Sequence, residues 1–131
     1  MEMSNRYLFD TNAIIYLMNG RLAFHLPEGE YSVSVITEIE LLSFPSLSES
    51  EEQKIHDLLR ELERIPLNDE VCRKTIQLRR TNNKLKLPDA VIAATAIIHD
   101  SILLTNDKMF SGIDGLSVQA LVLCDDTNRS L

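Results

Sequence analysis

The segment YLFDTNAIIYLMNG, residues 7–20, joins two apolar runs through an acid, a hydroxyl and an amide. The first run has the length of a buried strand, and the second predicts a helix over residues 12–18. Asp10 therefore stands where a strand ends and a helix begins. One interpretation is that Asp10 caps the helix, since Asp is a preferred N-cap residue. The other is that Asp10 belongs to a ligand site.

The remainder of the chain repeats this alternation of strand and helix. Strands are predicted at residues 6–9, 31–35, 101–105 and 118–122, and more weakly at 65–67. Helices are predicted at residues 12–18, 36–44, 51–64, 69–80 and 89–99. Ser48 and Glu51 form a capping-box pattern, and apolar residues then continue on one helical face as far as Ile65. Strands joined by helices predict an α/β fold with a parallel sheet covered on both faces.

Composition is typical of a globular protein, with 131 residues of which 44% are hydrophobic and 25% charged. We expect a single domain over residues 1–131, with residues 125–131 as a loose tail. No apolar run has the length of a membrane span, and no secretory signal pattern opens the chain. Cys72 and Cys124 lack metal-ligand spacing and fit free thiols. We therefore expect a cytoplasmic protein with no membrane contact.

Charge is distributed unevenly along the chain. Thirteen Lys and Arg against twenty Asp and Glu give a formal net charge of −7, which alone argues against a nucleic-acid partner. Residues 71–88, however, contain six of these bases and no acid. Four bases that lead into Asp89 are predicted to contact RNA phosphates: Arg79, Arg80, Lys84 and Lys86. A solvated helix face is the alternative interpretation of this segment.

Four acids occupy comparable places in the predicted fold. In such a sheet the ligand site lies beyond the carboxyl ends of the strands. Asp10 and Asp107 follow predicted strands, Asp89 opens the most apolar helix, and Glu40 lies within an apolar helical stripe. Each has a simpler interpretation: Asp10 and Asp89 as helix caps, Asp107 as a turn residue, and Glu40 as an exposed side chain.

Convergence of these acids would have a chemical consequence. Carboxylates gathered at one sheet edge repel one another, and a hard cation such as Mg²⁺ or Mn²⁺ relieves that repulsion. Beside a phosphodiester such an ion polarises the phosphoryl oxygen and activates water, so the set suits hydrolysis of a nucleic-acid backbone. Other chemistries find less support. The four glycines build no phosphate-binding loop, the three histidines lack zinc spacing, and no Gly-x-Ser-x-Gly elbow is present.

The sequence resembles the PIN-domain family and, within it, the VapC-type toxin ribonucleases. The resemblance is carried by YLFDTNAIIYLMNG (7–20), SVITEIELL (34–42), LPDAVIAATAI (87–97) and LLTNDKMF (103–110). It implies a three-layer α/β/α fold whose parallel sheet of about five strands has the order 3-2-1-4-5. It also implies an RNA-cleaving pocket in which Asp10, Glu40, Asp89 and Asp107 bind Mg²⁺ or Mn²⁺.

The resemblance also assigns roles to neighbouring residues. Glu40 matches the helical acid of the family better than Glu38 does, because residues 37–41 reproduce its Thr-x-x-Glu-Leu pattern. The supporting pocket residues are Thr11, Asn12 and Thr105. Where many relatives have a further acid after the fourth motif, this chain has Met109, so metal binding at that position rests on Asp107.

Two protein partners are implied by the resemblance: a second copy in a homodimer, and a small inhibitory antitoxin. The apolar runs at residues 13–18 and 40–44 could form a groove for an amphipathic helix, or could both be buried against the sheet.

Two rival functions remain open. One is an inert PIN-like module that binds RNA or protein without cutting. The other is a phosphatase of the haloacid dehalogenase type, which is disfavoured because Asn12 stands where a second acid is needed.

Overall fold

The computed structural model describes residues 5–23 and 25–124. Its sheet has the order β3-β2-β1-β4-β5, with every neighbouring pair parallel. The strands are β1 (Arg6–Phe9), β2 (Glu30–Ser34), β3 (Glu63–Ile65), β4 (Ile102–Leu104) and β5 (Val118–Gln119). The helices are α1 (Thr11–Met18), α2 (Val35–Leu42), α3 (Glu49–Arg60), α4 (Asp69–Thr81), α5 (Leu87–Ile98) and the short 3-10 helix η1 (Lys108–Phe110). The predicted α/β/α fold and strand order are confirmed. The predicted tail at residues 125–131 lies outside the described residues.

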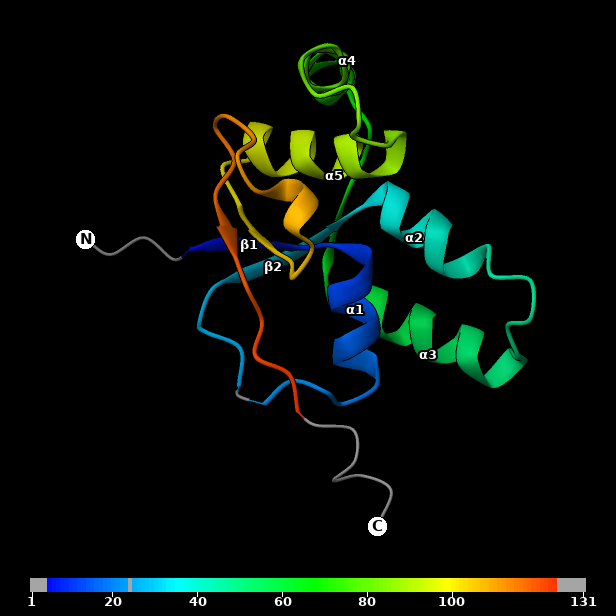
Figure 1. The fold of residues 1–131 in the computed structure, drawn as a ribbon. Helices are drawn as coiled ribbons and strands as arrows, with labels where there is room; N and C mark the ends of the chain where they lie inside the picture. The colour runs from blue at the N-terminus through cyan, green and yellow to red at the C-terminus, as the bar shows by residue number, and fades with distance from the viewer. Residues whose placement is uncertain (1–4, 24, 125–131) are drawn as a thin grey trace.

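Helices cover both faces of the sheet (Figure 1). Alternate residues of β1 point to opposite faces, so Leu8 packs with α4 and α5 whereas Tyr7 and Phe9 pack with α1 and α3. Helix α5 lies between the sheet and α4 and is buried without interruption from Ala90 to Ala96. A helix covered on two sides must be apolar all round, which explains its composition. Among the described residues, no helix is both long and apolar enough to cross a membrane.

The predicted helix over residues 51–64 starts two residues too late and ends four residues too far along the chain. Ser48 and Glu51 form the expected capping box, and the helix begins at Glu49. It ends at Arg60, because residues 63–65 pair with β2 and form β3. The weak strand predicted at residues 65–67 therefore lies two residues earlier in the chain.

Most other predicted boundaries also differ from the structure by one or more residues, and those of α5 and β5 are two examples. Helix α5 begins at Leu87 rather than Asp89, with Pro88 in the first turn, where a proline costs no helical hydrogen bond. Strand β5 is limited to residues 118–119, although 118–122 were predicted.

A turn of three residues, His99 to Ser101, connects α5 to β4. Asp100 has a φ of 52°, in the left-handed region, and the Ser101 N–H donates to the carbonyl of Ala96 at 2.8 Å. This is the hydrogen-bond pattern of a Schellman helix end. The chain therefore reverses at once, and β4 runs back against α5.

The carboxyl edge of the sheet gathers the candidate residues. Phe9 pairs with Val33 and with Leu104, so Asp10 lies between Ser34, the last residue of β2, and Thr105, the first residue after β4. Helices α1 and α2 begin at this edge. Helix α5 runs opposite to the strands, which brings its first turn to the same edge.

Candidate functional site

Asp10 is buried at the end of β1, with 4% of its surface exposed. Its Oδ1 accepts a hydrogen bond from the Ala13 backbone N–H at 2.6 Å, which confirms the predicted cap of α1. Its Oδ2 accepts a hydrogen bond from the Thr105 hydroxyl. Burial raises the pKa of Asp10 despite these two hydrogen bonds, and the charges of Asp107 and Glu40 raise it further. Asp10 is therefore both a cap and a neighbour of other acids.

Glu40 lies on the exposed side of α2, next to the start of α1. Thr11 Oγ1 donates to Glu40 Oε1 at 2.6 Å. Glu38 has different surroundings, because its Oε1 forms an ion pair with Arg64 at 2.7 Å. Of these two glutamates, Glu40 is the one whose charge raises the pKa of Asp10.

Asp89 lies in the first turn of α5 and is not its cap, since the N-cap is Lys86. Burial raises the pKa of Asp89, and the charges of Asp107, Glu40 and Asp10 add to the increase, whereas Lys86 lowers it. Asp107 caps the short helix η1. The charges of Asp107 and Glu40 therefore act on both Asp10 and Asp89, which places the four predicted acids at one edge of the sheet.

The predicted supporting residues differ in what they contact. Thr105 is buried and connects two acids: it accepts from the Asp107 N–H at 3.0 Å and donates to Asp10. Thr11 connects α1 to Glu40. Asn12 is exposed in the first turn of α1.

Carboxylate and hydroxyl oxygens make up this cluster, and these are the hard donors that Mg²⁺ and Mn²⁺ prefer. Over residues 5–23 and 25–124, no three His, Cys, Asp or Glu side chains converge closely enough to enclose an ion as they stand. Mg²⁺ is usually held by one or two carboxylates and several waters rather than by a complete protein cage. The donor chemistry therefore fits such an ion, with water completing its coordination.

The predicted RNA-contacting bases lie beside the acids in sequence and partly in space. Arg79 and Arg80 are exposed in the last turn of α4, and Lys84 is exposed in the loop that follows. The charge of Lys86 acts directly on Asp89. Arg79 also has a structural contact, because its Nε donates to the Leu85 carbonyl at 3.4 Å.

A groove of about 370 Å³ lies between α1, α2 and α3. Ile15 and Phe44 line it and are 39% and 66% exposed, so the two apolar runs are not wholly buried against the sheet. Thr11 and Glu40 also line this groove. The groove therefore reaches the acidic edge.

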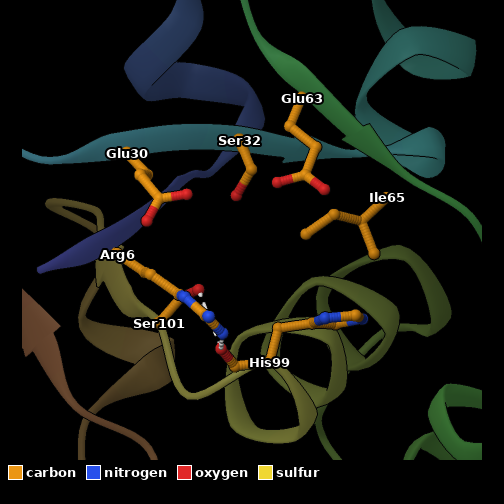
Figure 2. A pocket seen from close by; sticks show the side chains of 7 residues that line it. All are labelled: Arg6, Glu30, Ser32, Glu63, Ile65, His99 and Ser101. Carbon is orange, nitrogen blue, oxygen red and sulfur yellow. Dashed lines mark hydrogen bonds between the residues drawn. The ribbon is translucent and has the colours of Figure 1, made fainter. Parts of the chain in front are cut away.

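A smaller polar cavity of about 190 Å³ lies at the opposite edge of the sheet. Figure 2 shows the side chains of Glu30 and Glu63 directed from β2 and β3 toward the turn that carries His99. Arg6 donates to the His99 carbonyl at 3.3 Å. His99 Nε2 is buried with no hydrogen-bond partner among the described residues, and a cavity of this size has room for water to supply one.

The PIN-domain family model matches residues 7–116, most of the chain. The chain belongs to the PIN-domain family. No curated protein matches this PIN domain in sequence. Solved structures do match it, and each of these matches covers most of both chains.

Three of these structures are informative. A chain of a toxin–antitoxin complex from Klebsiella pneumoniae is 33% identical, with a TM-score of 0.69 over 84% of this chain and 94% of that one. VapBC-1 from nontypeable Haemophilus influenzae gives 28% identity and a TM-score of 0.70, over 88% and 97%. VapBC2 from Rickettsia felis, bound to a promoter DNA fragment, shares the fold at 24% identity and a TM-score of 0.74, over 89% and 99%. The predicted resemblance to VapC-type PIN domains is confirmed.

One functional candidate was missed at the sequence level. Thr37 was matched as part of a motif and given no role, yet its buried hydroxyl lies 3.1 Å from Thr11 Oγ1. A threonine three residues before an acid, on an otherwise apolar helix, is the signal that could have indicated it.

Proposed function

We propose that this PIN domain is a divalent-metal-dependent ribonuclease and the toxin of a type II toxin–antitoxin pair. The observation that carries the proposal is the coupling of the acids at the carboxyl edge, where burial and neighbouring carboxylates raise the pKa of both Asp10 and Asp89. Such a cluster favours a cation that offsets its charge. Similarity to a chain of a toxin–antitoxin complex supports the same conclusion.

Asp10, Glu40 and Asp89 are the proposed ligands of Mg²⁺ or Mn²⁺, with Asp107 as a further ligand. When bound, the ion would polarise the phosphoryl oxygen of RNA and lower the pKa of an attacking water. Thr105 and Thr11 hold Asp10 and Glu40 in place through their hydroxyls. The buried Asp10 fixes the inner end of the site, and the exposed Glu40 forms its outer side.

RNA is proposed to reach the acids along the basic end of α4 and the loop that follows. The net negative charge of the protein would repel RNA phosphates, so a local basic segment is needed to bind them. The proposed contacts are Arg79, Arg80, Lys84 and Lys86.

The cysteines Cys72 and Cys124 are free thiols, which fits a proposed place of action in the reducing cytoplasm.

Cleavage of RNA with Mg²⁺ or Mn²⁺, and with EDTA, tests the proposal. Asp10→Asn and Asp89→Asn are expected to lower the cleavage rate at least about 100-fold, because removing metal ligands or their supporting residues has effects of that order. Glu38→Gln is the matched control: it removes a charge from α2 on a side chain paired with Arg64, and cleavage should be retained.

Cleavage that survives EDTA or Asp10→Asn would overturn the metal mechanism. A wild-type protein that cuts no RNA, while still binding RNA or an antitoxin, would favour the inert PIN-like module instead.

The antitoxin is proposed to place an apolar helix face in the groove between α1, α2 and α3. Phe44 is the most exposed apolar side chain in that groove. In a co-expressed toxin–antitoxin pair, Phe44→Glu should release cleavage from inhibition. Ile39→Glu should not, since Ile39 is an exposed apolar residue of α2 that lies outside the groove. Equal inhibition of both variants would exclude this groove.

A homodimer is proposed through the surface where α4 meets the start of α5. Ile76 and Leu87, each 52% exposed, line one groove there together with Arg79 and Arg80, so the proposed dimer and RNA contacts share this surface. Exposed apolar side chains that share a groove are typical of an interface. Ile76→Glu should convert a dimer to a monomer in analytical ultracentrifugation. A wild-type monomer would exclude the dimer itself.

A further inference from the structure

Thr37 has a buried hydroxyl that its own helix does not satisfy. The residue is 0% exposed in the first turn of α2. Two other buried threonines of this chain behave differently: Thr75 donates to the carbonyl of Val71 and Thr95 to that of Val91, both at 2.7 Å. Thr37 lies too close to the start of its helix for such a bond, because the residue four positions earlier belongs to β2.

The partner of this hydroxyl is another threonine. Thr37 Oγ1 lies 3.1 Å from Thr11 Oγ1, which in turn lies 2.6 Å from Glu40 Oε1. Thr11 is the donor in its hydrogen bond to Glu40, so the single hydroxyl proton of Thr11 is directed to Glu40. The proton between the two threonines must then come from Thr37. The direction of the chain is therefore fixed: Thr37 donates to Thr11, and Thr11 donates to Glu40.

We propose that Thr37 is a positioning residue that fixes Glu40 through Thr11. Glu40 is an exposed side chain that would otherwise sample several rotamers. The buried Thr37 is held by packing on all sides, and a hydroxyl that already accepts a hydrogen bond is a better donor to the next acceptor. The role rests on the proposed function, since Glu40 has to be one of the metal ligands.

The buried acid of the site is held in a similar way. Asp10 accepts from Thr105, and the Thr105 hydroxyl itself accepts from the Asp107 backbone N–H at 3.0 Å. Each threonine that contacts an acid is thus oriented by a second donor. In one case that donor is a backbone amide, and in the other it is the side chain of Thr37.

Three variants test the proposal. Thr37→Val keeps the shape of the side chain and removes its hydroxyl, whereas Thr37→Ser keeps the hydroxyl. Thr75→Val is the matched control, because it removes a buried threonine hydroxyl remote from Glu40 in the hydrogen-bond network. Mn²⁺ affinity by titration calorimetry should fall about 10-fold in Thr37→Val, the effect expected for a residue that orients a ligand. It should be largely restored in Thr37→Ser and unchanged in Thr75→Val.

A second measurement separates this inference from the proposed function. NMR relaxation of the Glu40 methylene groups, without metal or RNA, should show an ordered side chain in the wild type and in Thr37→Ser, and a mobile one in Thr37→Val. Equal order in wild type and Thr37→Val overturns the proposal, as does a Thr37→Ser variant that behaves like Thr37→Val. Failure of the wild type to bind Mn²⁺ or cut RNA would overturn the proposed function instead.

If Thr37→Val does not fold, NMR of the wild-type protein still tests the role proposed for Thr37. The Thr37 hydroxyl proton should be protected from exchange and should give a nuclear Overhauser effect to Thr11. A hydroxyl proton that exchanges rapidly with water, with no such effect, contradicts the proposed direction of the chain.

Discussion

At the scale of single residues, the candidate site holds its acids with hydroxyls rather than with bases. Asp10 and Glu40 accept from Thr105 and Thr11. Ion pairs among the described residues involve other acids, such as Glu38 and the exposed acids of α3. A hydroxyl orients a carboxylate without cancelling its charge, so the negative potential remains available to a cation.

The raised pKa values of Asp10 and Asp89 link stability to pH. An acid whose pKa is higher in the folded protein binds more protons there than in the unfolded chain, so stability falls as pH rises from the ordinary value of 3.8 through the raised one. Without metal, the free energy of unfolding should therefore decrease through these two groups as pH rises above the ordinary value of 3.8. Asp10→Asn keeps a good cap and removes the charge, so it should weaken this decrease.

Thermal unfolding in EDTA, followed by circular dichroism across that pH range, measures the effect. Asp114→Asn, an exposed acid, serves as the control for loss of one charge. A pH dependence of Asp10→Asn that equals that of the wild type would show that Asp10 does not contribute. Added Mg²⁺ should stabilise the wild type near neutral pH more than it stabilises Asp10→Asn.

Sequence alone predicted which acids gather but not how they are held. Asp10 and Asp107 follow apolar strands, which is a local pattern, and parallel strands end at a common edge. The contact between Thr37 and Thr11 joins residues 26 positions apart, on two helices. No periodicity encodes which way a hydroxyl points across such an interface.

At the scale of secondary-structure elements, local chemistry fixes where most helices begin. Asp10, Ser34, Ser48 and Asn68 each accept a hydrogen bond from a backbone N–H in the first turn of the helix that follows. These residues are preferred caps, so most helix starts could be predicted to within a few residues. The end of α3 could not, because apolar spacing continued through Leu62 into a strand too short to show its own pattern.

The capping box of α3 gives a test at this scale. Ser48→Ala should lower the free energy of unfolding by about 1 kcal/mol, since it leaves an N–H of the first turn without its side-chain acceptor. Ser46→Ala, in the exposed loop just before, should change stability little. Chemical denaturation of both variants measures the difference. Equal stabilities would mean that packing against the sheet, rather than the cap, determines where α3 begins.

At the scale of the whole molecule, a net charge of −7 coexists with a basic segment at residues 71–88. In the proposed function this arrangement separates two tasks: acids at the sheet edge would attract a cation, and the exposed bases of this segment would attract phosphates. Electrostatic binding of RNA should then depend on where the bases lie and not on the total charge.

Arg79→Glu/Arg80→Glu should weaken RNA binding and reduce the dependence of log K on log salt by about 1.4, from about 0.7 for each lost contact with single-stranded RNA. Arg73→Glu/Lys74→Glu makes the same charge change two turns earlier on α4 and should have a smaller effect. Fluorescence anisotropy at several salt concentrations measures both. Equal losses would indicate a general charge effect, and no loss would remove the segment from the interface.

Because the turn at Asp100 is tight, the number of residues between Asp89 and Asp107 determines how these two acids lie relative to each other. Asp89 lies at the start of α5, so its position depends on the length of that helix. Asp107 follows β4, the strand that runs back against α5 after the three-residue turn. One residue inserted between Ala90 and Ile98 would rotate Asp89 by about 100° around the helix axis, away from the other acids. In the segment from 90 to 101, a substitution that preserves core packing should therefore be tolerated far better than any change in length, whereas loops such as 43–47 can lengthen without moving an acid.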